Sequence, residues 1–224
     1  FGGHLSGRPF ELRHGGMDTA FGAEFRSEST SKRPDALLAA ASTIGGTNFQ
    51  ATSGNRDVME FYAETNIPLW KNSAGTRALD VEIALRHSDY SDFGESTNPK
   101  IGFRLRLNKG LMLRGTYAEG FRAPSLNELY EGNSEAQAFI NDPCTQPQNV
   151  GVLPGCDQQA DPTRNQFLTI GGGNPNLKPE TSDSWGAGVV WSPSRLSGLT
   201  LSLGLFQVEQ NDVVSASAQF IVSQ

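Results

Sequence analysis

The stretch IGFRLRLNKGLMLRGTY, residues 101–117, decides the fold class of this chain. Apolar side chains occupy the odd positions Ile101, Phe103 and Leu105, whereas glycine and arginine occupy the even ones. The alternation resumes at Leu111, after the tight-turn signal Asn108-Lys109-Gly110. Because successive side chains of a strand point to opposite faces, a period of two predicts two strands with one apolar and one polar face.

The same period recurs on both sides of this stretch. Five further segments alternate in this way: residues 21–26, 58–69, 79–86, 184–191 and 199–206. Several segments are about 9 to 12 residues long, against a mean of about 5 to 6 for strands in soluble sheets. The pattern predicts an all-β fold of about seven to eight meandering antiparallel strands.

The connectors between these segments alternate in length. In chain order they are long, short, intermediate, tight, very long and short: 29–56, 71–75, 91–99, 108–110, 120–179 and 192–198. Short turns on one rim and long loops on the other are typical of a transmembrane β-barrel of the outer-membrane type. A soluble β-sandwich is the alternative, although its strands are usually shorter and its loops need not segregate in this way.

Aromatic residues near the ends of the segments favour the membrane interpretation. Trp70 and Trp191 lie toward the short-turn rim, and Tyr117, Phe121 and Trp185 lie toward the long-loop rim. Such belts are typical of membrane interfaces.

Composition excludes other classes. The 224 residues carry a formal net charge of −6 and no block of lysine and arginine, so we expect no nucleic-acid partner. The longest apolar run, residues 36–41, is far shorter than the roughly 18 residues that a membrane helix needs. The two cysteines, Cys144 and Cys156, lie in a stretch rich in Pro, Gln, Asn and Gly. This setting favours a disulfide in an oxidising compartment, with free thiols or a metal site as the alternatives.

Two motifs flank the longest connector. The first runs from Leu113 to Tyr130 and contains Phe121, Arg122, Ala123 and Pro124, followed by a capping box at Ser125 and Glu128. The second runs from Gly173 to Thr181 and contains Asn174, Pro175, Leu177, Pro179 and Glu180. In this order the pair closely resembles the barrel of TonB-dependent outer-membrane receptors, and weaker echoes extend the resemblance over roughly Gly16 to Val214.

The resemblance implies a receptor in the outer membrane of a Gram-negative bacterium. Such a receptor binds a scarce nutrient, for example a siderophore, cobalamin, an oligosaccharide or a peptide, and imports it with energy relayed by the TonB system. Its wide barrel, of about 22 strands, is closed by a plug domain. We find no plug segment and no terminal aromatic strand, so we expect residues 1–224 to be a partial barrel domain that lacks the plug and the C-terminal strands.

The expected partners are outer-membrane lipid, a small nutrient ligand and, through the missing plug, the TonB system. No cofactor and no enzymatic activity are expected, because no catalytic constellation can be assigned. The alternatives are a passive porin or adhesin barrel and a soluble all-β binding module.

Several residues are candidates for a site. The resemblance nominates the loop from Phe139 to Phe167, together with Tyr130, for ligand contact; the alternative is that they only pack the loops. Arg122 and Glu180 could form a cross-strand ion pair or remain independent charges. An acidic group could bind Ca²⁺, although a solvated external loop is favoured because the spacing matches no known calcium loop. Its members are Ser88, Asp89, Ser91, Asp92 and Glu95.

Overall fold

The computed structural model describes residues 1–42, 47–71, 77–107, 110–163, 165–196 and 198–215. It divides into two compact units, which are described separately. The first comprises Phe1–Glu28, Arg56–Pro124 and Lys178–Val213, and the second is built mainly from Ser29–Asn55 and Ser125–Leu177.

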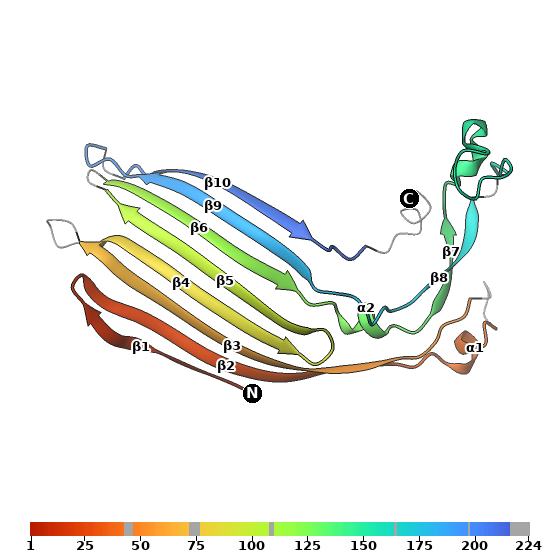
Figure 1. Cartoon of the computed structure of the whole chain (residues 1–224), viewed down its shortest axis with the longest axis horizontal. Helices are drawn as coiled ribbons and strands as arrows, with labels where there is room; N and C mark the ends of the chain where they lie inside the picture. Colours follow the sequence, from red (N-terminus) through yellow and green to blue (C-terminus); the bar gives the residue numbers. More distant parts are fainter. Residues whose placement is uncertain (43–46, 72–76, 108–109, 164, 197, 216–224) are drawn as a thin grey trace. The chain divides into compact units, whose positions relative to one another are not determined.

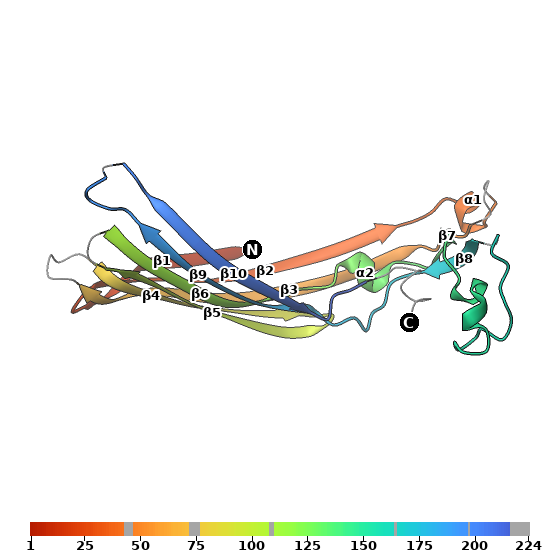
Figure 2. The same ribbon diagram turned by 90° about the horizontal axis from the view of Figure 1, so that it is seen from above.

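One antiparallel sheet forms the first unit and follows the chain order β1-β2-β3-β4-β5-β6-β9-β10 (Figure 1). Its strands are β1 (Gly2–Leu12), β2 (Gly15–Lys32), β3 (Thr52–Lys71), β4 (Arg77–Tyr90), β5 (Gly94–Arg106), β6 (Leu111–Arg122), β9 (Glu180–Trp191) and β10 (Leu201–Asn211). Within the residues described, the sheet is open, with β1 and β10 at its edges. The strands β4, β5, β6 and β9 lie side by side (Figure 1), and the view from above in Figure 2 shows that this layer is curved, as expected from the twist of strands.

All seven alternating segments are strands of this sheet, which confirms the predicted all-β antiparallel fold. The eighth strand, β1, was not predicted from alternation because its sequence, GGHLSGRPFEL, contains three glycines and a proline. Pro9 is tolerated there because β1 is an edge strand, where a missing N–H costs no ladder bond.

Register keeps the two faces of the sheet distinct. Direct partners across β4, β5, β6 and β9 are odd with odd and even with even. One row therefore consists of Ile83, Ile101, Tyr117 and Trp185, and the next consists of Glu82, Gly102, Thr116 and Gly186. We call the two surfaces the apolar face and the polar face.

Two register shifts change which face a side chain joins. In β1 the shift between Gly7 and Phe10 pairs Phe10 with Met17, an odd residue. In β3 the shift after Pro68 pairs Trp70 with Leu79. Because a slip of one residue exchanges the faces of a strand, both aromatic side chains join the apolar face despite their even numbers.

The apolar face ends in a row of carboxylates. Asp183 on β9 is the direct partner of Glu119 on β6 and of Glu209 on β10. The Tyr117 hydroxyl lies 2.8 Å from Asp183 Oδ1 and 3.0 Å from Glu119 Oε1, within donating distance of both.

The connectors follow the expected alternation with one correction. The link between β4 and β5 is only Ser91–Phe93, not residues 91–99, because β5 already begins at Gly94. Gly94 has a φ of +96°, which a glycine adopts without strain and which permits so short a turn. The expected turns at 71–75, 108–110 and 192–198 include residues 72–75, 108–109 and 197, which lie outside the described residues.

The second unit contains a separate hairpin of β7 (Ser134–Phe139) and β8 (Gln166–Gly171), which the sequence pattern did not predict. It also contains the helices α1 (Ala36–Ala39) and α2 (Leu126–Tyr130) and two short 3₁₀ turns, η2 (Pro143–Thr145) and η3 (Pro147–Asn149). In the part of the chain that is described, no helix has the length and apolar character to cross a membrane.

Candidate functional site

An ion network lies on the polar face toward the ends of β2 and β4 and the start of β3. Arg26 on β2 donates to Glu60 at 2.7 Å, to Glu28 at 2.9 Å and to the Tyr90 hydroxyl at 2.9 Å. The Ser88 hydroxyl donates to the second oxygen of Glu60 at 2.7 Å. Glu60 and Ser88 are buried, so these charge-assisted bonds replace water around the carboxylate. The network therefore fixes three strands in register through their side chains.

Arg56 extends this network to the first motif. Its Nε and Nη2 contact Glu28 Oε2 at 2.7 and 2.6 Å, and its Nη1 donates to the carbonyl oxygen of Pro124 at 2.6 Å. Asp92 lies 3.7 Å from the same guanidinium. Since Arg56 is only 8% exposed, this single side chain fixes the path of the chain as it leaves β6.

Three aromatic rings pack beside the network. Tyr90 stacks on Phe93 with ring centroids 4.5 Å apart, and Phe121 meets Tyr90 edge-on at 5.8 Å. The predicted place of Phe121 in an aromatic belt is thus corrected, because its ring belongs to this cluster. The β5 residues from Gly94 to Pro99 have no β6 partner, which leaves room for the ring.

Arg122 and Glu180 form the ion pair that the sequence suggested. They are direct partners on β6 and β9, and the guanidinium binds the carboxylate with both Nε and Nη2, at 2.8 and 2.6 Å. This bidentate geometry links β6, which leads into the longest connector, to β9, which follows that connector.

In the second unit the two motifs meet at α2. Ser125 and Glu128 form the predicted capping box, with bonds of 3.2 and 2.6 Å. The amide of Asn174 donates to the Glu128 carbonyl at 2.8 Å, and that of Gly173 donates to Glu131 at 2.7 Å. A side chain at Gly173 would collide with the backbone of Leu129, so glycine allows this close approach.

Tyr130, a candidate for ligand contact, packs against the backbone of the same unit. Its ring lies against Gly54, where an added Cβ would be only 2.3 Å from Tyr130 Cδ2. Phe139 pairs with Gln166, whereas Phe167 pairs with Ala138. Phe139 and Phe167 therefore point to opposite faces of the β7–β8 hairpin and do not converge on one ligand position. Their role in ligand contact stays a prediction.

Cys144 and Cys156 form the predicted disulfide, with their Cα atoms 5.2 Å apart. The bridge closes the segment that contains η2 and η3. Cys156 is buried, whereas most of the residues between the two cysteines are at least partly exposed. Backbone hydrogen bonds also order this segment, for example from the Gly151 amide to the Cys156 carbonyl at 2.8 Å. The covalent closure adds to them by restricting the unfolded chain.

A cavity of about 280 Å³ opens in the second unit and was not predicted from the sequence. Its basic wall is Lys32 and Arg33, and its apolar wall includes Leu38 and Phe49. Lys32 is paired with Glu131 at 3.3 Å, so Arg33 supplies the exposed positive charge. A cationic and partly apolar pocket suits a small anionic ligand.

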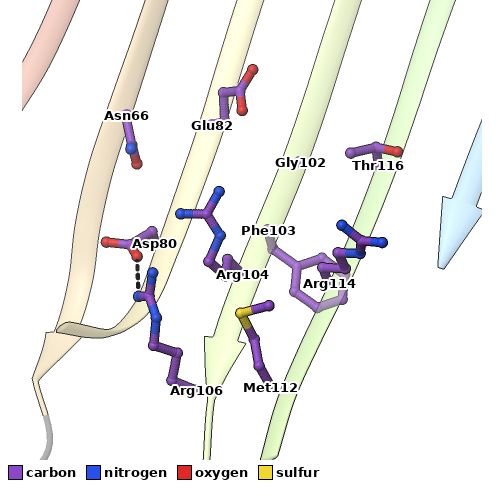
Figure 3. A pocket seen from close by; sticks show the side chains of 10 residues that line it. All are labelled: Asn66, Asp80, Glu82, Gly102, Phe103, Arg104, Arg106, Met112, Arg114 and Thr116. Carbon is purple, nitrogen blue, oxygen red and sulfur yellow. Dashed lines mark hydrogen bonds and ion pairs between the residues drawn. The ribbon is translucent and has the colours of Figure 1, made fainter. Parts of the chain in front are cut away.

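A larger hollow, of about 480 Å³, lies on the polar face of the first unit (Figure 3). Arginines from β5 and β6 line one side of this hollow, and acidic side chains from β4 line the other side. The lining consists of Asn66, Asp80, Glu82, Gly102, Phe103, Arg104, Arg106, Met112, Arg114 and Thr116. Figure 3 shows one ion pair among these residues, from Arg106 Nη1 to Asp80 Oδ2 at 2.8 Å.

The acidic group that was considered for Ca²⁺ is not one loop. Ser88 and Asp89 belong to β4, Glu95 belongs to β5, and only Ser91 and Asp92 lie in the turn. Ser88 faces Glu60, and the Ser91 hydroxyl accepts from the amide of Asp57 at 2.9 Å. No group of three or more potential metal ligands is present in the described ranges.

Long antiparallel strands with one apolar and one polar face are typical of the wall of an outer-membrane β-barrel. Residues 3–223 match the family model described as TonB dependent receptor-like, beta-barrel. The chain belongs to this family, and it is an outer-membrane protein of the Gram-negative type.

Individual relatives agree with this assignment. A probable TonB-dependent siderophore receptor PirA of Acinetobacter baumannii is 24% identical over 185 residues, which cover 80% of this chain and 21% of that protein. The chain thus spans about a fifth of this curated relative.

Solved structures share the fold. The siderophore receptor PirA from Pseudomonas aeruginosa superposes with a TM-score of 0.62 at 18% identity, over 93% of this chain and 31% of that one. A mutant of the ferric enterobactin receptor PfeA from Pseudomonas aeruginosa, in complex with enterobactin, gives a TM-score of 0.66 at 17% identity, over 93% and 26% of the two chains.

Proposed function

We propose that this chain forms part of the wall and outer loops of a receptor that imports a small nutrient with energy from the TonB system. The apolar face contacts lipid and the polar face lines the lumen, because a hydrocarbon layer accepts the first and a hydrated or protein-filled lumen accepts the second. The observation that carries the proposal is the family match over residues 3–223.

The proposed ligand is a ferric siderophore. The relatives bearing names of known function are siderophore and ferric enterobactin receptors. The cavity with Lys32 and Arg33 fits this class of ligand, since many iron chelates are anionic and carry aromatic groups that pack on residues such as Phe49. A plug domain of the same receptor, contributed by another part of its chain, fills the lumen and contacts TonB.

The test uses the complete receptor encoded by the gene that contains this sequence. Cells that lack their own siderophore receptors are supplied with the gene and grown under iron limitation with single purified ferric siderophores. We expect uptake of labelled iron from at least one siderophore, and loss of that uptake when TonB is deleted. Uptake that persists without TonB would instead indicate a passive barrel, and uptake from none of the siderophores would contradict the ligand class.

A further inference from the structure

The hairpin of β7 and β8 has one covered edge and one open edge. On the β7 side, the Glu135 amide donates to the Asn48 carbonyl at 2.9 Å, and the Gln50 amide donates to the Asn133 carbonyl at 2.8 Å. Asn48 and Gln50 belong to the connector between β2 and β3, so a segment of a different loop already extends this small sheet. On the other side of β8, which borders β7 in Figure 1, no strand is present among the residues that the structure describes.

The ladder between β7 and β8 shows which backbone groups face the open edge. The Ile140 amide donates to the Asn165 carbonyl at 3.0 Å, and these two residues continue the register of the hairpin as direct partners. Hydrogen-bonded pairs alternate with non-hydrogen-bonded pairs along an antiparallel ladder. Thr169 therefore directs its backbone groups to β7, whereas Leu168 and Ile170 direct their N–H and C=O groups to the open edge.

The open edge lacks the features that usually prevent further pairing. The sequence of β8 is QFLTIG, with no charged residue and no proline, and its register with β7 has no bulge. Natural edge strands are commonly protected by such features, because unpaired N–H and C=O groups recruit other strands. Leu168 and Ile170 are also 56% and 68% exposed, and they share one face of the hairpin with Phe139, which is 72% exposed. Both the edge and this face are therefore suited to contact another segment.

We propose that an extended segment of another long loop of the complete receptor pairs with the open edge of β8 and adds a strand to this sheet. The backbone of the segment exchanges hydrogen bonds with Leu168 and Ile170, as in other cases of strand addition. Its apolar side chains pack beside these two residues, on the face that carries Phe139. The segment has no proline at the positions that donate to β8, since proline has no N–H.

A segment of the same molecule suits this edge better than a transient partner. An unprotected edge needs a permanent cover, and the opposite edge of the same hairpin is already covered by residues 47–50 of another loop. The match with the PirA relative spans 21% of that protein, so a receptor of this length has further loops to supply the segment. The proposal rests on the family assignment and is independent of the ligand and of TonB.

The first test is residue-resolved hydrogen exchange of the complete receptor in detergent. Thr169 is the internal control, because its amide is directed to β7 whether or not the open edge is covered. We expect the amides of Leu168 and Ile170 to exchange several-fold or more slowly than those of unstructured chain, as Thr169 does. Exchange of both amides at the rate of unstructured chain, beside a protected Thr169, would overturn the proposal.

The second test identifies the covering segment. A photo-crosslinking amino acid at Ile170 should link, within one molecule, to a loop outside residues 1–224. The matched control is Thr169, whose side chain lies on the opposite face and should not give this link. Leu168→Pro removes an outward N–H and leaves the ladder to β7 intact, so it should lower the cross-linked fraction at least several-fold. Leu168→Ala keeps this N–H and should lower the fraction less.

Folding of each variant is checked by the heat-dependent gel mobility of folded barrels and by continued protection of Thr169. A cross-linked product with the mass of two receptors would overturn the proposal in favour of pairing between copies. A link that Leu168→Pro does not weaken would show contact without strand pairing, which also contradicts the proposal. Protected amides without a link to any further loop would overturn the choice of segment. A receptor that passes these tests and imports no siderophore would contradict only the proposed function.

Discussion

The guanidinium of Arg56 donates to the carbonyl oxygen of Pro124 over 2.6 Å, although 68 residues separate the two in sequence. Arg56 sits on β3 and Pro124 lies just after the end of β6. The bond therefore links the second half of the Phe-Arg-Ala-Pro motif to a strand three positions away in the sheet, and it requires β4 and β5 to be in register between them.

Replacement of Arg56 tests this link. In Arg56→Ala, the Pro124 carbonyl loses the Arg56 guanidinium and Glu28 keeps only Arg26, at a cost of roughly 1 to 3 kcal/mol for a buried carbonyl left unsatisfied. We expect urea unfolding of the complete receptor in detergent to shift to lower concentration. The unfolding midpoint of Arg56→Lys should fall between those of the unchanged receptor and Arg56→Ala, because lysine keeps the charge but not the planar guanidinium. An unchanged midpoint for Arg56→Ala would show that the bond does not stabilise the fold.

Arg122 and Glu180 offer a charge-swap experiment. The single variants Arg122→Glu and Glu180→Arg each place like charges on directly opposite residues, so we expect both to reduce the yield of folded receptor. The double variant Arg122→Glu/Glu180→Arg should recover much of that yield, measured as the fraction with folded gel mobility. If the double variant folds no better than the worse single one, the two side chains act independently.

The disulfide predicts a pattern of thiol labelling. Denatured receptor should react with a maleimide at Cys144 and Cys156 only after reduction. Replacement of both cysteines by serine should speed proteolysis between residues 140 and 165, since closure of a loop of this size stabilises by about 2 to 4 kcal/mol. Labelling of the oxidised receptor, or equal rates of cleavage with and without the bridge, would contradict this role.

Gly54 should not tolerate a side chain. Gly54→Ala places a methyl group 2.3 Å from Tyr130 Cδ2, so one of the two must move, and overpacking of this kind costs typically about 1 to 3 kcal/mol. We expect faster hydrogen exchange at residues 126–133 in this variant, and slower exchange again when Tyr130→Ala is added. Gly171→Ala is the matched control, because nothing lies within 4 Å of an added Cβ there.

The strands were predictable because their period is local. The alternation within each segment is enough to assign its side chains to the two faces. Because segments 101–107 and 111–117 are separated by only three residues, they pair as neighbours, with Arg104 opposite Arg114. This like-charged pair was therefore visible in the sequence, although only the structure shows that Asp80, the direct partner of Arg104, binds Arg106. By contrast, β1 was missed because its glycines and Pro9 weaken the alternation.

The contacts of the ion network could not be predicted. Arg26 and Glu60 lie on strands joined by a connector of 19 residues between β2 and β3, so their register does not follow from the local sequence. The face that the Trp70 side chain joins depends on a register shift. A strict period of two therefore assigns this side chain to the wrong face. The cavity at Lys32 and Arg33 is built from segments about 100 residues apart, which no spacing rule connects.

With the apolar face against lipid, as proposed above, the row formed by Glu119, Asp183 and Glu209 would set the depth of the barrel wall in its bilayer. Ionised carboxylates do not enter hydrocarbon, so the acyl chains must end below this row. Asp183 and Trp191 are separated by about 27 Å along β9, or about 21 Å along the membrane normal at a tilt of about 40°. This is close to the apolar band of about 25 Å in outer-membrane barrels, so we expect the proposed barrel wall to match a thin membrane, and a thicker one to deform around it.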